Sequence, residues 1–210
     1  MHSNAIILCG LDEAGRGPLA GPIVACGVIL HSSFTQLEKL SGIKIRDGKL
    51  LSSIQREKVF RILTPSLTTI YPASISVSGI NRYGIGWANK ELFRRLIRKI
   101  PANRFVIDGN LHISVRNSAK YIQSIVDADA TIPEVILAGI CAKVIRDTMM
   151  DRYHKQFPQY HWNTNAGYGT KAHIEAIKKN GVTPLHRTVF VTTALHQKNN
   201  PSGNKVILFK

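Results

Sequence analysis

Four acidic residues are candidates for catalysis in a chain that is otherwise strongly basic. Asp12 and Glu13 are adjacent near the N-terminus, and Asp108 and Asp129 follow much later. Asp12 and Asp108 each close a predicted strand, and Asp129 follows another strand just before a predicted helix. Because ligands in α/β sheets gather beyond the carboxyl ends of strands, we expect these acids to lie close together.

Clustered carboxylates repel one another and tolerate a phosphate-rich substrate poorly unless a cation neutralises them. Mg²⁺ or Mn²⁺ suits this role because both ions prefer oxygen ligands and bridge to phosphate oxygens. Two such ions, about 3.5–4 Å apart, stabilise the attacking and leaving oxygens of a phosphoryl displacement. Successive strand residues point to opposite faces, so Asp12 and Glu13 share a site only if the strand ends or bulges there. Gly15 makes such a break plausible.

Each acid also has an ordinary explanation. The Asp12–Glu13 pair before a turn is typical of a solvated strand end. Asp108 belongs to the sequence IDGN, in which Asp and Asn favour a turn. Asp129 is typical of an acid that stabilises the positive end of a helix dipole. Only their combination in one basic chain favours metal chemistry.

The charge of the chain indicates a polyanionic partner. Lys and Arg number 28 against 13 Asp and Glu, which gives a formal net charge of +15. Nucleic acid is the leading candidate, because each neutralised phosphate releases counterions. A generally basic protein, or one that binds an acidic membrane surface, is the alternative.

The compartment is predicted from cysteine usage and from the absence of targeting signals. Cys9, Cys26 and Cys141 each lie in an apolar run and form no C-x-x-C motif, which favours reduced buried thiols over zinc or disulfides. No basic segment precedes the first apolar run, and no apolar run approaches the roughly 18–20 residues that cross a bilayer. We therefore expect a cytoplasmic protein that contacts no membrane.

Hydrophobic periodicity predicts an α/β fold. The predicted strands are 5–11, 22–30, 67–77, 104–108 and 121–126. The predicted helices are 53–63, 86–100, a long helix from the capping-box pair Thr131 and Glu134 to Tyr153, and 170–179. Three strands in sequence followed by β-α alternation indicate a mixed sheet flanked by helices.

The two longest predicted helices carry defined buried stripes. In 86–100 the stripe is expected to hold Leu92, Leu96 and Ile100. In the long helix it is expected to hold Leu137, Cys141, Val144, Thr148 and Tyr153.

The expected domain organisation is one domain and a tail. Residues 1–195, including C-terminal helices, form the domain, and residues 196–210 form a basic tail. The composition of residues 197–210 is typical of a loop or a disordered segment. A docking motif for a replication partner in KVILFK is the alternative.

Several motifs in order carry a family resemblance. They are LDEAGRGPLAGP (11–22), VIDGN (106–110), AKVIRD (142–147), FPQY (157–160), GYGT (167–170) and HRTVF (186–190). Together the chain resembles bacterial ribonuclease HII, a type 2 ribonuclease H, over nearly its whole length.

The resemblance implies an RNase H-like mixed sheet with three antiparallel strands plus parallel strands. It also implies a metal-dependent endonuclease that cuts the RNA strand of RNA/DNA hybrids and incises 5′ to a ribonucleotide embedded in duplex DNA. Such enzymes leave a 3′-hydroxyl and a 5′-phosphomonoester, and use two Mg²⁺ or Mn²⁺ ions. The family's four acids fall on Asp12, Glu13, Asp108 and Asp129.

The resemblance also implies substrate contacts. The family's Gly-Arg-Gly falls on Gly15, Arg16 and Gly17, where glycines admit a sugar and peptide groups read a 2′-hydroxyl. Its junction-sensing tyrosine falls on Tyr168, which by residue type alone is an ordinary loop tyrosine.

Further substrate contacts are expected from basic side chains. Lys49, Lys143 and Arg146 are the candidates. Surface salt bridges with Asp147 are the alternative for the last two.

Five positions depart from the family pattern. They are Gly48, Leu50, Asp127, Ala166 and Val189, and three expected lysines are missing among them. These positions normally surround bound nucleic acid, so they bear on affinity and junction preference more than on chemistry. Asp127 either adds a fifth carboxylate to the metal site or faces away.

Three functions remain in competition. The first is a monomeric ribonuclease HII that acts on misincorporated ribonucleotides. The second is a ribonuclease HIII-like enzyme restricted to longer hybrids, a relative that lacks Gly-Arg-Gly and has an N-terminal domain for which we expect no counterpart before Asp12. The third is a nucleic-acid-binding homologue with impaired catalysis.

Overall fold

A computed structural model describes residues 5–45, 50–116 and 119–198. The chain divides into two compact units, each of which is assembled from three segments. The first holds Met1–Ala14, Val24–Ser74 and Lys90–Val144. The second holds Gly15–Ile23, Ile75–Asn89 and Ile145–Lys210.

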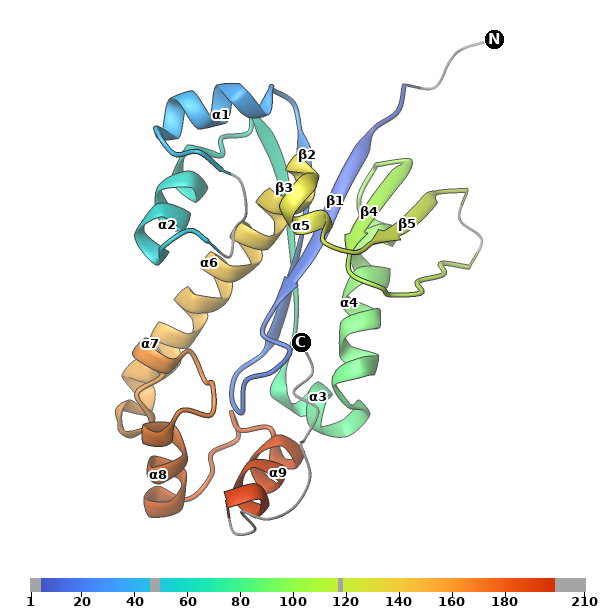
Figure 1. Cartoon of the computed structure of the whole chain (residues 1–210). Helices are drawn as coiled ribbons and strands as arrows, with labels where there is room; N and C mark the ends of the chain where they lie inside the picture. The colour runs from blue at the N-terminus through green and yellow to red at the C-terminus, as the bar shows by residue number, and fades with distance from the viewer. Residues whose placement is uncertain (1–4, 46–49, 117–118, 199–210) are drawn as a thin grey trace. The chain divides into compact units, whose positions relative to one another are not determined.

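The five strands form one mixed sheet (Figure 1). They are β1 (Leu8–Ala14), β2 (Ile23–Leu30), β3 (Thr68–Ile75), β4 (Arg104–Asp108) and β5 (Tyr121–Ile125). Their order across the sheet is β3-β2-β1-β4-β5. β1 runs antiparallel to β2 and parallel to β4, and β5 runs parallel to β4. The predicted mixed α/β sheet is confirmed.

The end of β1 differs from the prediction. Its parallel pairing with β4 stops at Leu11 opposite Ile107, but its antiparallel pairing with β2 continues to Ala14. Asp12 and Glu13 therefore still pair with β2, but they lie beyond the last residues that pair between β1 and β4. The prediction of a strand that ends at Leu11 is wrong, because β2 supplies partners for three more residues.

The helices associated with the first unit are α1 (Phe34–Ser41), α2 (Ser53–Ile62), α4 (Ile85–Lys99), α5 (Ala128–Thr131) and α6 (Pro133–Gln156). α4 and α6 each begin in one unit and end in the other. α1 was not predicted. The Ser33 hydroxyl caps it by accepting from the backbone N–H of Gln36 at 3.2 Å.

Close backbone packing fixes α6 against the sheet. A Cβ on Gly10 of β1 would overlap the backbone of Glu134 and Val135 at the start of α6. A Cβ on Gly27 of β2 would overlap Ile100, just after α4. Glycines therefore allow both helices to approach the sheet closely.

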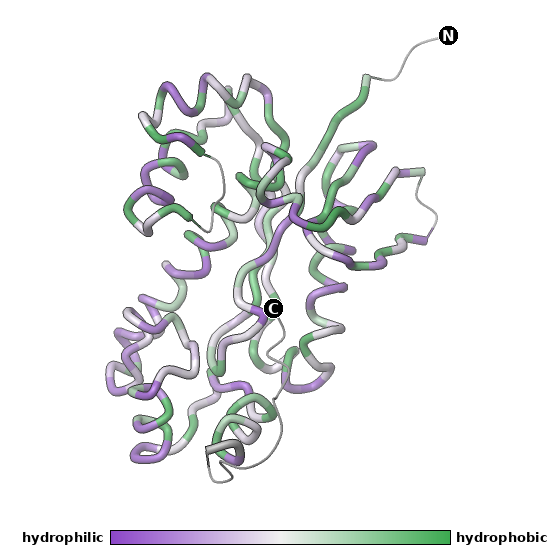
Figure 2. Tube along the Cα trace, viewed as in Figure 1, coloured by the Kyte–Doolittle hydropathy of each residue, from purple (hydrophilic) through white to green (hydrophobic). Residues whose placement is uncertain are grey.

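α4 is amphipathic as predicted. Leu92, Leu96 and Ile100 are buried, whereas Arg95 and Arg98 are exposed. Figure 2 shows the resulting alternation of green and purple along this helix.

The predicted capping box at the start of α6 is wrong. Thr131 is the last residue of α5, and its hydroxyl donates to the carbonyl of Asp127 at 3.3 Å, so no capping box opens α6. The helix instead begins at Pro133, a residue suited to a first helical turn.

The buried stripe of α6 is confirmed in part, since Tyr153 is partly buried against the core of the second unit and Val144 is partly buried. Leu137 and Cys141 are buried, but Thr148 is exposed. Arg146 and Met150 are the buried side chains in the second half, because there the helix belongs to the second unit and packs on other residues.

The second unit is helical around the segment 15–23. Its helices are α3 (Val77–Tyr83), the 3-10 turn η1 (Pro158–Tyr160), α7 (Trp162–Asn165), α8 (Lys171–Asn180) and α9 (Thr188–Lys198). Its core includes Leu19, Met150, Trp162 and Ile177. The backbone N–H groups of Leu19 and Ala20 both donate to the carbonyl of Gly167, at 2.8 and 3.2 Å.

α9 extends further than the predicted tail boundary. It ends at Lys198, so residues 197 and 198 are helical rather than part of a loop. The remainder of the predicted tail, 199–210, lies outside the described residues. Within the part of the chain that the structure describes, no helix is long and apolar enough to cross a bilayer.

Candidate active site

Asp12 and Asp108 lie at neighbouring positions of two parallel strands. The ladder between β1 and β4 ends with Leu11 opposite Ile107, so the two aspartates occupy the next position of that register. The sequence predicted this meeting, because carboxyl ends of parallel strands share one edge of a sheet.

Asp129 is connected to Asp108 by its backbone. It lies in the short helix α5, its side chain is buried, and its N–H donates to Asp108 Oδ1 at 3.2 Å. α5 itself packs on β4, since Val106 and Ala128 share a small apolar cluster with Val135. This packing brings the third predicted acid to the end of β4.

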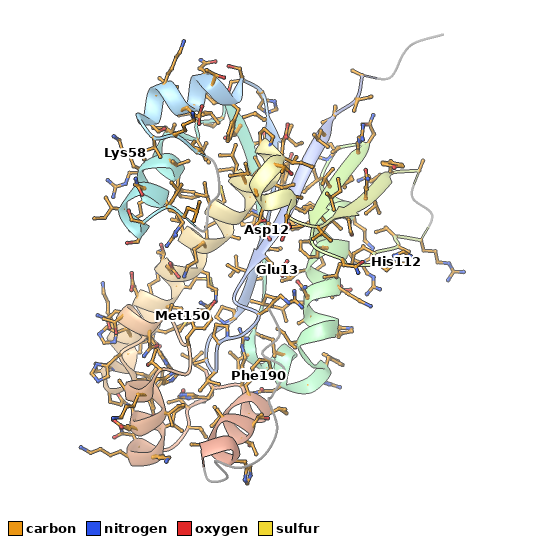
Figure 3. The ribbon with its side chains drawn as sticks, viewed as in Figure 1. Asp12, Glu13, Lys58, His112, Met150 and Phe190 are labelled. Atoms are coloured by element: carbon orange, nitrogen blue, oxygen red, sulfur yellow. The ribbon has the colours of Figure 1, made fainter. Side chains whose placement is uncertain are left out.

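Glu13 follows Asp12 inside β1, and the two side chains are labelled on that strand in Figure 3. Asp12 Oδ1 accepts a hydrogen bond from the backbone N–H of Glu13 at 2.7 Å. The aspartate carboxylate therefore folds back towards its neighbour.

The pKa of Asp12 reports how these charges interact. Burial raises the pKa of this carboxyl well above its usual range, and repulsion from Glu13 raises it further. The hydrogen bond from the Glu13 backbone opposes this effect, and the charges of Asp108 and Asp129 add to the rise. Glu13, Asp108 and Asp129 thus each act electrostatically on Asp12.

Asp127 is placed differently. It adopts a left-handed conformation (φ 57°) before α5, forms no side-chain cap there, and is exposed. Of the two alternatives left open by the sequence, the exposed side chain favours the one in which Asp127 faces away.

The pocket around Asp12 is shaped for a carboxylate. A Cβ on Gly139 of α6 would overlap Asp12 Oδ2, so only glycine at this position leaves room for that oxygen. The donors are carboxylate oxygens, which suit Mg²⁺ and Mn²⁺. Among residues 5–45, 50–116 and 119–198, however, no three His, Cys, Asp or Glu side chains stand close enough to hold an ion as they are placed. The donor chemistry fits a divalent ion, and the repulsion on Asp12 is what a cation would relieve.

In the second unit, Arg187 organises the Gly-Arg-Gly loop. Its buried guanidinium donates to the carbonyls of Gly15, Arg16 and Gly21 at 2.6, 2.9 and 3.0 Å. Burial, followed by the charge of Arg146, lowers the pKa of Arg187 to about 9. The peptide groups of the predicted sugar-contacting loop are therefore held by a side chain that sequence reasoning missed.

Arg146 is buried beneath the same loop and is not an exposed substrate contact. Its guanidinium donates to the carbonyls of Pro22, Ala20 and Ala166 at 3.1, 3.2 and 3.0 Å. A Cβ on Gly15, which has a φ of 96°, would overlap this guanidinium. The prediction of an exposed basic substrate contact is wrong for Arg146, because its side chain is buried and its guanidinium donates to three backbone carbonyls.

Tyr168 stands next to the loop. Its side chain is 44% exposed, and the Cβ position of Gly17 lies 3.9 Å from a ring carbon. The Arg146 guanidinium carbon lies 5.9 Å from the ring centroid. The second unit thus brings together Gly17 and Tyr168, two residues predicted to contact substrate.

Two buried histidines support the backbone of Tyr168. Trp162 Nε1 donates to His173 Nε2 at 3.0 Å, so the proton of His173 belongs on Nδ1, which lies 2.9 Å from the Tyr168 carbonyl. His186 Nε2 lies 3.3 Å from His173 Nε2, and its Nδ1 accepts from the Thr183 N–H at 2.9 Å. The hydrogen bonds therefore define two neutral histidines.

The other predicted contacts are distributed as follows. Lys143 is partly exposed on α6, and Leu50 and Val189 are exposed. Ala166 has a φ of 47°. Gly48 and Lys49 lie outside the described residues.

The signal for the missed residues was present in the sequence. Arg187 and His186 belong to HRTVF, and His173 follows GYGT by three positions, but no role was predicted for these three residues.

Comparison with known proteins agrees with this architecture. The family model described as Ribonuclease HII matches residues 9–193. A relative from Aliarcobacter butzleri, named Ribonuclease HII, is 40% identical over 205 residues, which cover 96% of this chain and 98% of the relative.

Solved structures of the same fold are more distant in sequence. RNase HII of Archaeoglobus fulgidus, in a complex with PCNA, matches with a TM-score of 0.73 and 23% identity over 87% of this chain and 94% of that chain. Bst-RNase HIII in complex with Mn²⁺ matches with a TM-score of 0.68 and 14% identity, over 93% of this chain and 71% of that chain.

Proposed function

Because the chain belongs to the ribonuclease HII family, hydrolases that cleave RNA in RNA/DNA hybrids and leave 5′-phosphomonoesters, we propose that it also incises 5′ to single ribonucleotides embedded in duplex DNA. In the cell this activity would begin the removal of misincorporated ribonucleotides during DNA replication and repair. The reaction is metal-dependent in this proposal.

One observation carries the metal dependence. The pKa of Asp12 is raised by burial and by the charges of Glu13, Asp108 and Asp129 together. A divalent cation that joins the cluster would relieve this repulsion. Bst-RNase HIII, a neighbour in fold, was solved with Mn²⁺.

We assign the four acids to the divalent ions. Asp12, Glu13, Asp108 and Asp129 would hold two Mg²⁺ or Mn²⁺ ions, which supply an activated water and neutralise the charge that develops on the scissile phosphate. Gly139 and the Glu13 N–H orient the Asp12 carboxylate for this role. The Asp129 N–H holds Asp108 in the same way.

Recognition of the ribonucleotide is assigned to the second unit. Gly15, Arg16 and Gly17 would offer peptide groups to the 2′-hydroxyl, and Tyr168 would stack on the neighbouring deoxyribose. Support comes from the hydrogen bonds of Arg187, which fix the carbonyls of Gly15 and Arg16 and so preorganise the loop. Ordered peptide groups discriminate a hydroxyl better than a mobile loop does.

The proposal is tested with a DNA duplex that contains one ribonucleotide. Incubation with Mg²⁺ or Mn²⁺ should give a nick on the 5′ side of the ribonucleotide, with a 5′-phosphate. Asp129→Asn should abolish turnover while duplex binding is retained. Asp127→Asn is the matched control, because Asp127 is two residues away but exposed, and it should retain turnover.

Failure of wild-type protein to nick this duplex with either ion would refute the proposal. Cleavage of an all-RNA hybrid without cleavage at a single ribonucleotide would favour the HIII-like alternative. Binding of either substrate without any cleavage would favour the homologue with impaired catalysis.

We also propose that the enzyme acts as a cytoplasmic monomer that docks on a replication clamp. Cys9, Cys26 and Cys141 are free and buried, which suits a reducing compartment.

The Archaeoglobus fulgidus homologue was solved in complex with PCNA, which supports a clamp as the partner. Light scattering tests the monomer. Clamp binding by the full chain, compared with a chain that ends at Lys198, tests the role of the tail.

A further inference from the structure

The turn between α3 and α4 exposes an aromatic pair that the proposed activity does not use. The ring centroids of Tyr83 and Trp87 lie 4.4 Å apart with an interplanar angle of 39°. Tyr83 is 51% exposed and Trp87 is 37% exposed. Exposed aromatic rings that lie against each other offer apolar surface on which a planar ligand can stack.

The turn between the two rings carries little side-chain bulk. Gly84 and Gly86 both lie between Tyr83 and Trp87 in the sequence, and a Cβ built on either would meet no atom within 4 Å. Gly84 ends α3 with a φ of 82°, a conformation that favours glycine. The backbone of the turn is therefore open next to both glycines.

Positive charge accompanies the rings. The guanidinium carbon of Arg82 lies 5.1 Å from the Tyr83 ring centroid, and Arg82 is exposed. Aromatic faces combined with arginine are the surface that binds unpaired nucleotides, since bases stack on the rings and phosphates meet the cations.

The pair is attached to the segment that supports the Gly-Arg-Gly loop. Asn81 of α3 donates to the carbonyl of His186 at 3.2 Å, and its Oδ1 accepts from the N–H of Thr188 at 3.0 Å. Arg187, between those two residues, holds the carbonyls of Gly15 and Arg16. α3 is therefore connected to the loop by side-chain and backbone hydrogen bonds within one unit.

We propose that Tyr83, Trp87 and Arg82 form a stacking platform for an unpaired nucleobase of single-stranded nucleic acid. The platform binds by stacking and charge and so tolerates any base. It contributes no catalytic group to the proposed reaction. Its use would be to hold single-stranded nucleic acid that adjoins the duplex being cut.

The chain carries its own reporter for this contact. It has two tryptophans, and Trp162 is fully buried while Trp87 is exposed. Titration with a single-stranded oligothymidine in EDTA, where no cleavage occurs, should quench the fluorescence of Trp87. Tyr83→Ala and Trp87→Leu should each weaken binding of a dye-labelled oligothymidine about tenfold, as loss of one stacking face does.

Tyr121→Ala is the matched control. Tyr121 is 57% exposed and has the Arg104 guanidinium carbon 5.6 Å from its ring centroid, but it lies on β5. Its loss should leave oligothymidine affinity within about twofold, since it is outside the platform. Arg82→Gln keeps both rings but removes the guanidinium beside Tyr83, and should flatten the salt dependence of binding by about one phosphate contact.

The platform is refuted if wild-type fluorescence does not change on titration. It is also refuted if the affinities of Tyr83→Ala, Trp87→Leu and Arg82→Gln equal that of wild type, or if Tyr121→Ala loses as much. Because binding is measured without metal, these results do not depend on the proposed incision activity. Loss of cleavage with retained quenching would instead count against the proposed function alone.

Discussion

Arg187 donates a hydrogen bond of 2.6 Å to the carbonyl of Gly15, a residue 172 positions away along the chain. The same guanidinium also holds Arg16 and Gly21, so one side chain near the C-terminus fixes the conformation of a loop near the N-terminus. A planar group with five N–H donors is suited to three carbonyls at once. A contact between residues far apart in the sequence thus orders the Gly-Arg-Gly loop, although its glycines are flexible residues.

Replacing Arg187 should damage both stability and recognition. Arg187→Lys keeps the charge but offers a single ammonium in place of the fork, so buried carbonyls lose partners at about 1–3 kcal/mol each. We expect the free energy of unfolding, measured in urea, to fall by a few kcal/mol. Incision at a single ribonucleotide should fall at least about tenfold, and more than cleavage of an all-RNA hybrid.

Arg152→Lys is the control for Arg187→Lys, because Arg152 is exposed on α6. Its stability and cleavage rates should match those of wild type. Equal losses on both substrates in Arg187→Lys would show that the side chain supports folding only and not recognition of the ribonucleotide.

Gly139→Ala tests the pocket around Asp12 without removal of any carboxylate. The added methyl group would overlap Asp12 Oδ2, so the aspartate must move. We expect kcat to fall at least about tenfold, because displacement of a metal ligand weakens the whole site. The dependence of the rate on Mn²⁺ concentration should shift to higher concentrations, which titration of the metal measures directly.

Gly86→Ala provides the comparison for this prediction. Gly86 is also helical, but a Cβ there meets nothing within 4 Å. Alanine should therefore stabilise α4 by up to about 1 kcal/mol and leave the rate unchanged. If Gly139→Ala leaves kcat and the metal dependence unchanged, Asp12 is not a metal ligand.

The sequence predicted the sheet and the positions of Asp12 and Asp108 at its edge, for a physical reason. Strands such as β4 are apolar and short, and their ends are marked by Asp108 and Gly109, so the position of the acid is a local property. Residues at the ends of neighbouring parallel strands then meet as a consequence of topology. Even so, β1 extends past Asp12, because its length depends on pairing with β2, which local sequence does not reveal.

The second unit was much harder to predict, because long-range hydrogen bonds define it. The helical spacing of Arg146 from Lys143 and Asp147 is typical of a helix surface. Its side chain is nevertheless buried, and its guanidinium donates to carbonyls of the segment 20–22 and of residue 166. His173 is likewise buried, and its Nε2 accepts a hydrogen bond from Trp162 Nε1. α3 has only 7 residues, and α9 lacks a strong hydrophobic periodicity, so their formation depends on the packing of the unit.

Stability should decrease in mild acid because of the buried histidines. Burial, followed by the charge of His173, lowers the pKa of His186 to about 4, against 6.5 for the free side chain. Between these values the unfolded chain binds a proton that the folded chain does not, so stability is lost as pH falls from 6.5 towards 4. His186 alone should remove up to about 3 kcal/mol, measured by urea unfolding at several pH values.

His186→Gln should be less stable at neutral pH but should show a flatter pH dependence between 6.5 and 4. His112→Gln changes an exposed histidine and should leave the slope as in wild type. If the slope of His186→Gln equals that of wild type, His186 is not the group that takes up the proton.

Tyr168 should matter for the choice of substrate more than for the reaction itself. The ring is exposed beside Gly17, and the carbonyl of Tyr168 lies 2.9 Å from His173 Nδ1, so the ring is presented by a fixed backbone. Tyr168→Ala should lower incision at a single ribonucleotide about tenfold more than cleavage of an all-RNA hybrid, because only the former contains the RNA-to-DNA step within the recognised nucleotides. Tyr168→Phe keeps the stacking face and should recover most of the loss that is due to stacking, which leaves any remaining deficit to the hydroxyl. Equal losses on the two substrates in Tyr168→Ala would mean that the ring does not sense the junction, and discrimination would then belong to the peptide groups that Arg187 holds in place.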